Sequence, residues 1–326
     1  MDAAREATRA RLPLTVIGGF LGAGKTTLLN RLLRDSAGRR LAVLVNDFGA
    51  LNIDAELIAA SAGDTIALTN GCVCCSIGDD LTAALIRVIE APLPFDAVVI
   101  EASGVSDPWR IAQVGLADPG LGLDGVIVLV DAGACLAHAG DPLLADSLQR
   151  QLEAADLLIV NKSDLVDATG LQEVRDWLAL AAPGTPRFET SQARVPMALL
   201  SGAALSIDGQ AHAQGGDHDH DHDHDHGRDD ATSAQHGEDF ETWSCRPARV
   251  FAASALRALL REMPAGVLRL KGIVRSDEHG WAELQFAGRH GSLRKALAAP
   301  AAGAAVVAVG LRGRLPAQTL ESVLCY

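Results

Sequence analysis

Three thiols and a phosphate-loop pattern stand close together in the first quarter of the chain. Residues 71–76 read Gly-Cys-Val-Cys-Cys-Ser, and residues 19–26 read Gly-Phe-Leu-Gly-Ala-Gly-Lys-Thr. Thiolates bind soft or borderline metal ions, and a glycine-rich turn that leads into a helix presents backbone N–H groups to phosphate. The two segments together predict a nucleotide site that is coupled to a metal site.

The phosphate-loop segment matches the pattern G-x-x-x-x-G-K-[ST] between an expected strand and an expected helix, which is the context this motif requires. Lys25 is expected to reach the β- and γ-phosphates, and Thr26 to ligate Mg²⁺. The alternative is a glycine-rich turn without a ligand, which the agreement of strand, loop, lysine and threonine disfavours. The residues expected to contact the nucleotide here are Gly19, Gly22, Ala23, Gly24, Lys25, Thr26 and Thr27.

A second motif concerns the base. Residues 160–164 read Val-Asn-Lys-Ser-Asp after an apolar run and match Asn-Lys-x-Asp, a signature of GTP-binding proteins. An aspartate accepts two hydrogen bonds from guanine N1–H and the 2-amino group, and adenine offers no such pair of donors. Asn161, Lys162 and Asp164 therefore predict a guanine nucleotide, with an ordinary strand-end turn as the alternative.

Acidic residues end two further expected strands. One of these strands ends in Glu101-Ala-Ser-Gly104. Glu101 can hold Mg²⁺ through water, and the backbone N–H of Gly104 can sense the γ-phosphate, as switch segments do. Asp131 ends the other strand and is the weaker alternative for the Mg²⁺ role.

The clustered thiols suit a single metal ion. In an extended segment Cys72 and Cys74 point to the same side, and Cys75 becomes a third ligand after a local turn. Zn²⁺ accepts tetrahedral thiolate and imidazole ligands, and Co²⁺ and Ni²⁺ fit similar sites. Buried structural cysteines, or a redox pair activated by a helix terminus, are the alternatives. The scattered cysteines, Cys135, Cys245 and Cys325, are expected to be core or incidental residues.

Residues 217–226 alternate strictly between Asp and His. Five imidazoles on one side of an extended chain would form a weak, multivalent metal buffer. A solvated acidic linker is the alternative. The histidines are His218, His220, His222, His224 and His226.

The composition limits the class of protein. With 326 residues, of which 48% are hydrophobic, the chain has room for one sizeable domain and a smaller one. The net charge of −13 argues against nucleic acid or an anionic membrane as a partner. No apolar run reaches the ~18–20 residues of a membrane span, and the stretch 12–24 lacks a convincing signal-peptide cleavage site. Six cysteines, three of them clustered, are not a disulfide framework, and a cytoplasmic location is expected.

Apolar runs alternate with helical patterns in the N-terminal part, which predicts an α/β fold of the P-loop NTPase type with a mostly parallel, doubly wound sheet. Ligands of such sheets bind at the carboxyl ends of strands, where the motifs above lie. Strands are expected at 14–18, 41–46, 97–101, 125–131 and 157–161, and helices at 25–34, 79–89, 141–154 and 171–180.

Residues 208–239 contain almost nothing apolar, which divides the chain. The expected parts are a GTPase domain over 1–207, a flexible linker rich in His and Asp over 208–240, and a small α+β domain over 241–326. In the last part helices are expected at 253–262 and 316–324, and strands at 267–274, 281–286 and 304–310.

With these motifs the chain resembles the CobW family of GTPases, which belong with the hydrogenase- and urease-maturation GTPases of the SIMIBI type. The resemblance covers nearly the whole chain, and its specific part is the Cys-x-Cys-Cys element. It is carried by residues 19–27, Asn-Asp-Phe-Gly at 46–49, Asn-Gly-Cys-Val-Cys-Cys at 70–75, 101–104 with Asp107-Pro108, 161–164, the His-rich loop and Arg269-Leu-Lys-Gly272.

The resemblance implies slow GTP hydrolysis and delivery of a transition metal to a client metalloenzyme. Members are associated with zinc homeostasis, cobalt insertion in cobalamin synthesis and nitrile hydratase activation, so Zn²⁺ is favoured and Co²⁺ is close behind. It also implies a metal or Mg²⁺ ligand at Asp47, where many members have Glu, and a CobW-type C-terminal domain. The sequence names neither the client nor the oligomeric state, for which a homodimer is one expectation. Two other functions stay open: a metal-storage or sensor module with GTP as a structural cofactor, and a thiol redox switch.

Overall fold

The computed structural model of the chain describes residues 11–35, 39–45, 65–67, 77–200, 240–288, 290–296, 299–300 and 303–325. Within these ranges, no helix has both the length and the apolar character needed to cross a bilayer.

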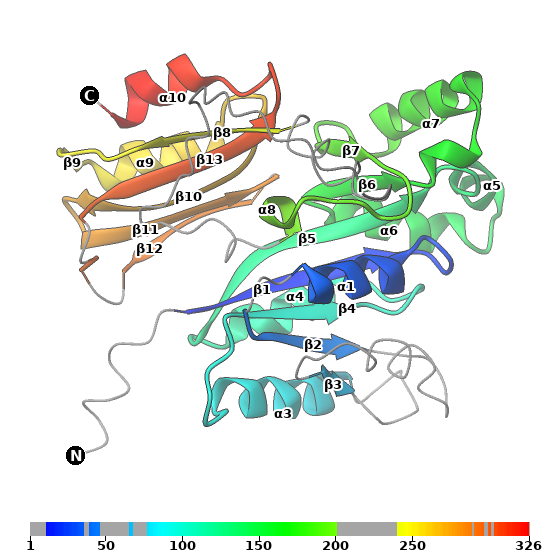
Figure 1. Cartoon of the computed structure of the whole chain (residues 1–326), viewed down its shortest axis with the longest axis horizontal. Helices are drawn as coiled ribbons and strands as arrows, with labels where there is room; N and C mark the ends of the chain where they lie inside the picture. Colours follow the sequence, from blue (N-terminus) through cyan, green and yellow to red (C-terminus); the bar gives the residue numbers. More distant parts are fainter. Residues whose placement is uncertain are drawn as a thin grey trace, which may run out of the picture.

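The N-terminal domain is built on a seven-stranded sheet in the order β3-β2-β4-β1-β5-β6-β7 (Figure 1). Every neighbouring pair is parallel, as the uninterrupted apolar runs predict. All five residues of β2, β4 and β6 are buried, because helices cover both faces. The strands are β1 (Leu12–Gly19), β2 (Leu41–Val45), β3 (Thr65–Ala67), β4 (Ala97–Glu101), β5 (Leu121–Asp131), β6 (Leu157–Asn161) and β7 (Arg187–Glu189).

Two apolar cores lie on opposite faces of this sheet. One face packs against α3, α4, α5, α6 and α7. The other face packs against α1 and α8, and also against Leu268 and Val309 of the C-terminal domain. The helices are α1 (Lys25–Arg34), α3 (Ile77–Ile89), α4 (Pro108–Ala117), α5 (Cys135–Gly140), α6 (Ala145–Ala154), α7 (Ala168–Ala181) and α8 (Met197–Leu200), with a short 3₁₀ helix η2 (Ser163–Leu165).

The C-terminal domain is a second, mainly antiparallel sheet in the order β12-β11-β10-β13-β8, with β9 paired in parallel to β10 (Figure 1). Its own core includes Leu256 and Leu260 of α9 and Leu320 and Leu324 of α10. The elements are β8 (Phe240–Cys245), β9 (Val250–Phe251), α9 (Ala253–Arg261), β10 (Val267–Ser276), β11 (Gly280–Ala287), β12 (His290–Lys295), β13 (Ala305–Leu311) and α10 (Ala317–Leu324). The α+β prediction for this part is confirmed.

Several expected boundaries are wrong. The helix expected at 141–154 begins only at Ala145, as α6, because residues 141–144 form a turn in which the Asp141 carboxylate accepts from the N–H of Leu143. The short helix α5, which ends just before this turn, was not expected. Strand β5 begins at Leu121, four residues before the expected start at Gly125. The earlier start was not predicted because the polar Asp124 lies inside the strand. Helix α4 was not expected at all. Strands β3, β7, β8, β9 and β12 and helix α8 were also missed.

The two domains meet through buried charges as well as apolar contacts. Arg269 on β10 lies 3.2 Å from the carboxylate of Asp124 on β5, with 5% and 3% of the two side chains exposed. Gln285 on β11 donates to the same carboxylate, at 2.9 Å. Asp156 accepts from the backbone of β5 and pairs with His290 on β12, whose ring stacks on Trp109 of α4 at 5.0 Å between centroids. The C-terminal domain is therefore fixed to the sheet that carries the candidate site.

Candidate functional site

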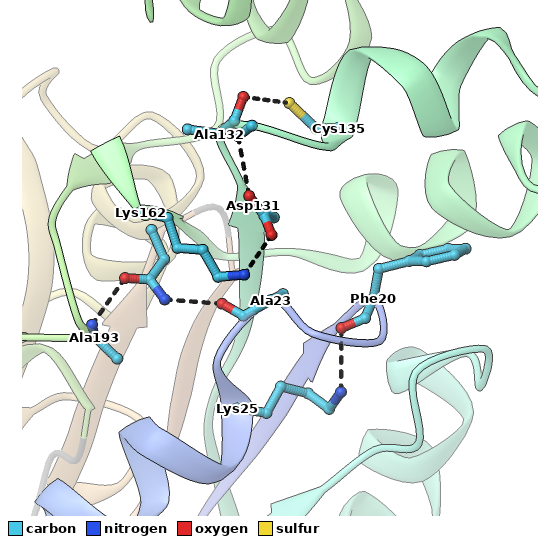
Figure 2. Close-up of polar contacts among 10 residues, drawn as sticks. Phe20, Ala23, Lys25, Asp131, Ala132, Cys135, Lys162 and Ala193 are labelled. Atoms are coloured by element: carbon cyan, nitrogen blue, oxygen red, sulfur yellow. Dashed lines mark hydrogen bonds and ion pairs between the residues drawn. The ribbon is translucent and has the colours of Figure 1, made fainter. Parts of the chain in front are cut away.

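The phosphate loop joins β1 to α1, as expected. Gly24 caps the N-terminus of α1 in the left-handed region, with φ of 104°, and no side chain caps this end of the helix. Lys25 is almost fully buried, and its ammonium donates to the carbonyl of Phe20 at 3.3 Å across the loop (Figure 2). Thr26 is half-buried and Thr27 is exposed. The segment has the form of an anion nest.

Asn161 connects the phosphate loop to the segment expected to read the base. Its amide nitrogen donates to the carbonyl of Ala23 at 2.8 Å, and its amide oxygen accepts from the N–H of Ala193 at 2.8 Å. A side chain at Gly24 would lie 2.4 Å from the Asn161 amide nitrogen, so this close approach requires glycine. The distant motifs at 19–27 and 161–164 are therefore parts of one site.

The rest of the Asn-Lys-x-Asp segment lies beside this connection. Lys162 has a left-handed backbone with φ of 61°, and its ammonium lies 2.7 Å from the Asp131 carboxylate (Figure 2). Asp164 is exposed in η2, which leaves its carboxylate accessible to a base. The N–H of Ser163 donates to the carbonyl of Thr190, which holds the segment against the end of β7.

Sequence reasoning missed the loop after β7. Gln192 and Ala193 both have positive φ, at 52° and 53°, although neither is glycine. The loop is held in this conformation by Asn161, and by Arg31 of α1, which donates to the carbonyl of Gln192 at 2.8 Å. Such strained backbone clusters at ligand sites. No local residue pattern marks it, because the partners that hold it are distant in the sequence.

The two carboxylates considered for Mg²⁺ have different surroundings. Glu101 is 3% exposed, and its carboxylate lies 3.9 Å from the Lys25 ammonium. Asp131 pairs with Lys162 and accepts from the N–H of Gly133, at the base end of the site. Glu101 is thus the carboxylate that lies beside the phosphate-loop lysine.

The turn after Glu101 contacts the phosphate loop directly. A Cβ at Gly104 would lie 2.8 Å from the backbone nitrogen of Leu21, so only glycine fits. A residue that the sequence did not single out, Gln151 of α6, bridges the two segments. Its amide oxygen accepts from the N–H of Gly19 at 2.7 Å, and its amide nitrogen donates to the carbonyl of Gly104 at 2.9 Å.

The candidate soft-metal ligands fall outside the described ranges. These are Asp47, Cys72, Cys74 and Cys75, together with His218, His220, His222, His224 and His226. Among the residues with described positions, no group of three or more His, Cys, Asp or Glu side chains forms a metal site. The thiol cluster and the His run therefore stay predictions.

The scattered cysteines behave as expected. Cys135 is 2% exposed in the core, and burial raises the pKa of its thiol to about 11. Cys245 and Cys325 are half-buried in the C-terminal domain, where burial and their mutual hydrogen bond raise the pKa of the Cys245 thiol well above its usual range.

Comparison with known proteins agrees with this arrangement. Residues 13–188, more than half of the chain, match the family described as CobW/HypB/UreG, nucleotide-binding domain. Residues 240–324 match the cobalamin synthesis protein cobW C-terminal domain. The two matches fall on the two sheets.

Curated relatives carry related names. The zinc chaperone CobW of Sinorhizobium sp is 34% identical over 231 residues, which cover 62% of this chain and 65% of the relative. The zinc chaperone YjiA of Escherichia coli is 34% identical over 198 residues, 58% of this chain and 60% of the relative. The zinc-regulated GTPase metalloprotein activator 1 of Schizosaccharomyces pombe is 34% identical, over 52% of this chain and 43% of the relative. The chain thus spans less than two thirds of the length of each of these relatives.

Among solved structures, the Zn(II)-bound YjiA GTPase from E. coli aligns over 97% of this chain and 98% of that chain, with 21% identity and a TM-score of 0.47. The assignment of the chain to a family rests on the two family matches over residues 13–188 and 240–324. The first match covers the phosphate loop, the Asn-Lys-x-Asp segment that Asn161 joins to it, and all but the outermost residues of the parallel sheet. The antiparallel sheet lies within the second match. The chain therefore belongs to the CobW/HypB/UreG family.

Proposed function

We propose that the chain binds and hydrolyses GTP, and that the cycle drives delivery of a transition metal to a client metalloenzyme. Zn²⁺ is the favoured metal and Co²⁺ the second. The proposal that the chain binds GTP rests on the Asn161 side chain, which hydrogen-bonds both the phosphate loop and the 190–193 loop. This contact supports a single site made of the phosphate loop and the expected guanine-binding segment 161–164.

The described residues supply the binding and positioning groups for hydrolysis. The backbone N–H groups of residues 22–26 hold the phosphates, and Lys25 supplies positive charge to the oxygens on which charge develops in the transition state. Asp164 accepts from the guanine edge, and Lys162 of the same segment pairs with Asp131. Gly104 lies against Leu21 of the phosphate loop. Its backbone would contact the γ-phosphate when GTP is bound.

The residues present also fit Mg²⁺, which prefers oxygen ligands and keeps several waters. The Thr26 hydroxyl stands at the start of α1, and the Glu101 carboxylate is buried beside Lys25. Thr26 would hold the ion directly and Glu101 through water. When bound, the ion neutralises charge on the β- and γ-phosphate oxygens.

The metal half rests on Cys72, Cys74 and Cys75, which suit Zn²⁺ or Co²⁺ as cargo, with Asp47 as a further ligand or a Mg²⁺ ligand. The His run would act as a weak, multivalent metal buffer. The relatives named zinc chaperones and a zinc-regulated metalloprotein activator favour zinc. We place the protein in the cytoplasm, where such clustered thiols stay reduced and able to bind metal.

Lys25→Ala tests the nucleotide half. The variant is expected to lose GTP hydrolysis by at least about 100-fold while far-UV circular dichroism stays unchanged. Lys295→Ala on β12 is the matched control, because it removes an exposed lysine that lies on the other sheet, in the C-terminal domain. Normal turnover in folded Lys25→Ala protein would remove the assignment.

Two other functions predict different results. A storage or sensor module, in which GTP is only structural, predicts that bound metal leaves GTP turnover unchanged. A thiol redox switch predicts a disulfide within residues 72–75 and no metal in the purified protein. Metal content and GTP turnover with and without Zn²⁺ distinguish the three.

A further inference from the structure

Gln151 is a buried polar side chain that neither nucleotide motif contains. It lies in the last turns of α6, is 1% exposed, and has partners for both ends of its amide. A buried glutamine that satisfies two backbone groups from separate segments fixes the distance between these segments.

The partners determine how the amide is oriented. Gly19 offers an N–H, so the Gln151 oxygen must face it, and Gly104 offers a carbonyl, so the Gln151 nitrogen must face that. Gly19 opens the phosphate loop, and Gly104 belongs to the turn after the buried Glu101. The same turn packs against the phosphate-loop residue Leu21.

We propose that Gln151 is the positioning residue that holds the Gly104 turn at the distance from the phosphate loop at which its backbone meets the γ-phosphate. This inference rests on the proposed GTP hydrolysis. Gln151 does not touch the nucleotide itself, because both ends of its amide are used by the protein backbone. Its effect is specific to the triphosphate state, since GDP has no γ-phosphate for the Gly104 turn to meet.

Substitutions of similar length separate this role from simple packing. Gln151→Met keeps the length and apolar volume but removes both hydrogen bonds. Gln151→Glu keeps the acceptor for Gly19 and replaces the donor to Gly104 with a carboxylate oxygen, which repels that carbonyl until it is protonated. Gln149→Met is the matched control, since Gln149 lies on the same helix and bonds Glu153 and the carbonyl of Ala181 instead.

The experiment measures GTP turnover, and the affinities for GDP and for a non-hydrolysable GTP analogue, on the full chain. For Gln151→Met we expect kcat to fall about 10- to 100-fold and the analogue to bind about 10-fold more weakly. GDP affinity should stay within about twofold, because the Gly104 turn meets only the γ-phosphate. The Gln151→Glu rate, relative to wild type, should rise as the pH falls from about 9 to about 6, since a protonated carboxyl again donates to Gly104.

Two results overturn the inference. In the first, Gln151→Met matches wild type and Gln149→Met in rate and in the ratio of analogue to GDP affinity. In the second, Gln151→Met weakens GDP and the analogue equally and lowers the melting temperature, which assigns Gln151 a packing role. If wild type and Gln149→Met themselves fail to hydrolyse GTP, the proposed function fails instead, so the two failures are distinguishable.

Discussion

The buried ion pair between Arg269 and Asp124 should be a main determinant of how the two domains hold together. The partners are 3.2 Å apart, and 5% and 3% of their side chains are exposed. Removal of one partner from such a pair leaves an uncompensated charge in the interior, which costs about 3–5 kcal/mol. We therefore expect Arg269→Met to lower the free energy of unfolding by about that amount.

The double variant tests the reason. In Arg269→Met/Asp124→Asn neither partner of the buried pair carries a charge. Gln285 donates to the native Asp124 carboxylate at 2.9 Å, and the amide oxygen introduced by the second substitution can still accept this hydrogen bond. Most of the lost stability should return, because an apolar or neutral replacement of a buried pair is often close to neutral. Arg257→Met is the matched control, since Arg257 forms an ion pair with Glu278 in the same domain but both side chains are more than 40% exposed.

Urea unfolding followed by tryptophan fluorescence measures these differences, and Trp109 reports on the domain contact because it stacks on His290. The control should change the unfolding midpoint very little. The reasoning is refuted if Arg269→Met costs no more than Arg257→Met, or if the double variant is no more stable than Arg269→Met.

Three further results are expected. Asp164→Asn should weaken GTP binding and favour xanthosine triphosphate, because the new amide donates to the 2-oxo group; an unchanged preference in competition binding would show that Asp164 does not read the base. Burial raises the pKa of the Cys135 thiol to about 11, so the folded state favours the neutral thiol. The stability that this raised thiol pKa gives the folded state is present below the ordinary thiol pKa and is lost as pH rises to about 11. In urea unfolding, wild type should therefore lose more stability than Cys135→Ala between about pH 9 and 11. Deletion of residues 217–226 should remove only weak metal binding in equilibrium dialysis, and loss of the tightest site would show that the two metal sites are reversed.

The fold of the first domain could be predicted because its strands are apolar on both faces. The runs at 97–101 and 157–161 coincide with β4 and β6. The start of β5 could not be predicted, because the polar Asp124 and the following Gly125 resemble a turn in the sequence. Only the structure shows that Arg269 of the other domain neutralises the Asp124 carboxylate. Helix α4 carried a signal that was overlooked: Asp107 caps it by accepting from the N–H of Trp109, and Pro108 occupies its first turn.

The site could be predicted only where a local motif encodes it. The phosphate loop and the Asn-Lys-x-Asp segment do so, because each supplies its own backbone geometry and functional groups. Gln151 and the Gln192–Ala193 loop do not, because their roles arise from contacts with Gly19, Gly104 and Asn161 across the sheet. Strand β12 was missed for a related reason, since most of its residues are polar and none is fully buried.

The central claim is that the nucleotide state controls metal affinity, and competition with a chromogenic chelator tests it most directly. Zn²⁺ affinity would be measured with GDP and with a non-hydrolysable GTP analogue bound, for wild type and for the variant with Cys72, Cys74 and Cys75 changed to Ser. We predict a difference of roughly 5- to 150-fold between the two states in wild type, tighter with the GTP analogue, and none in the Ser variant. Equal affinity in both states of the wild-type protein would contradict the account and favour a storage module.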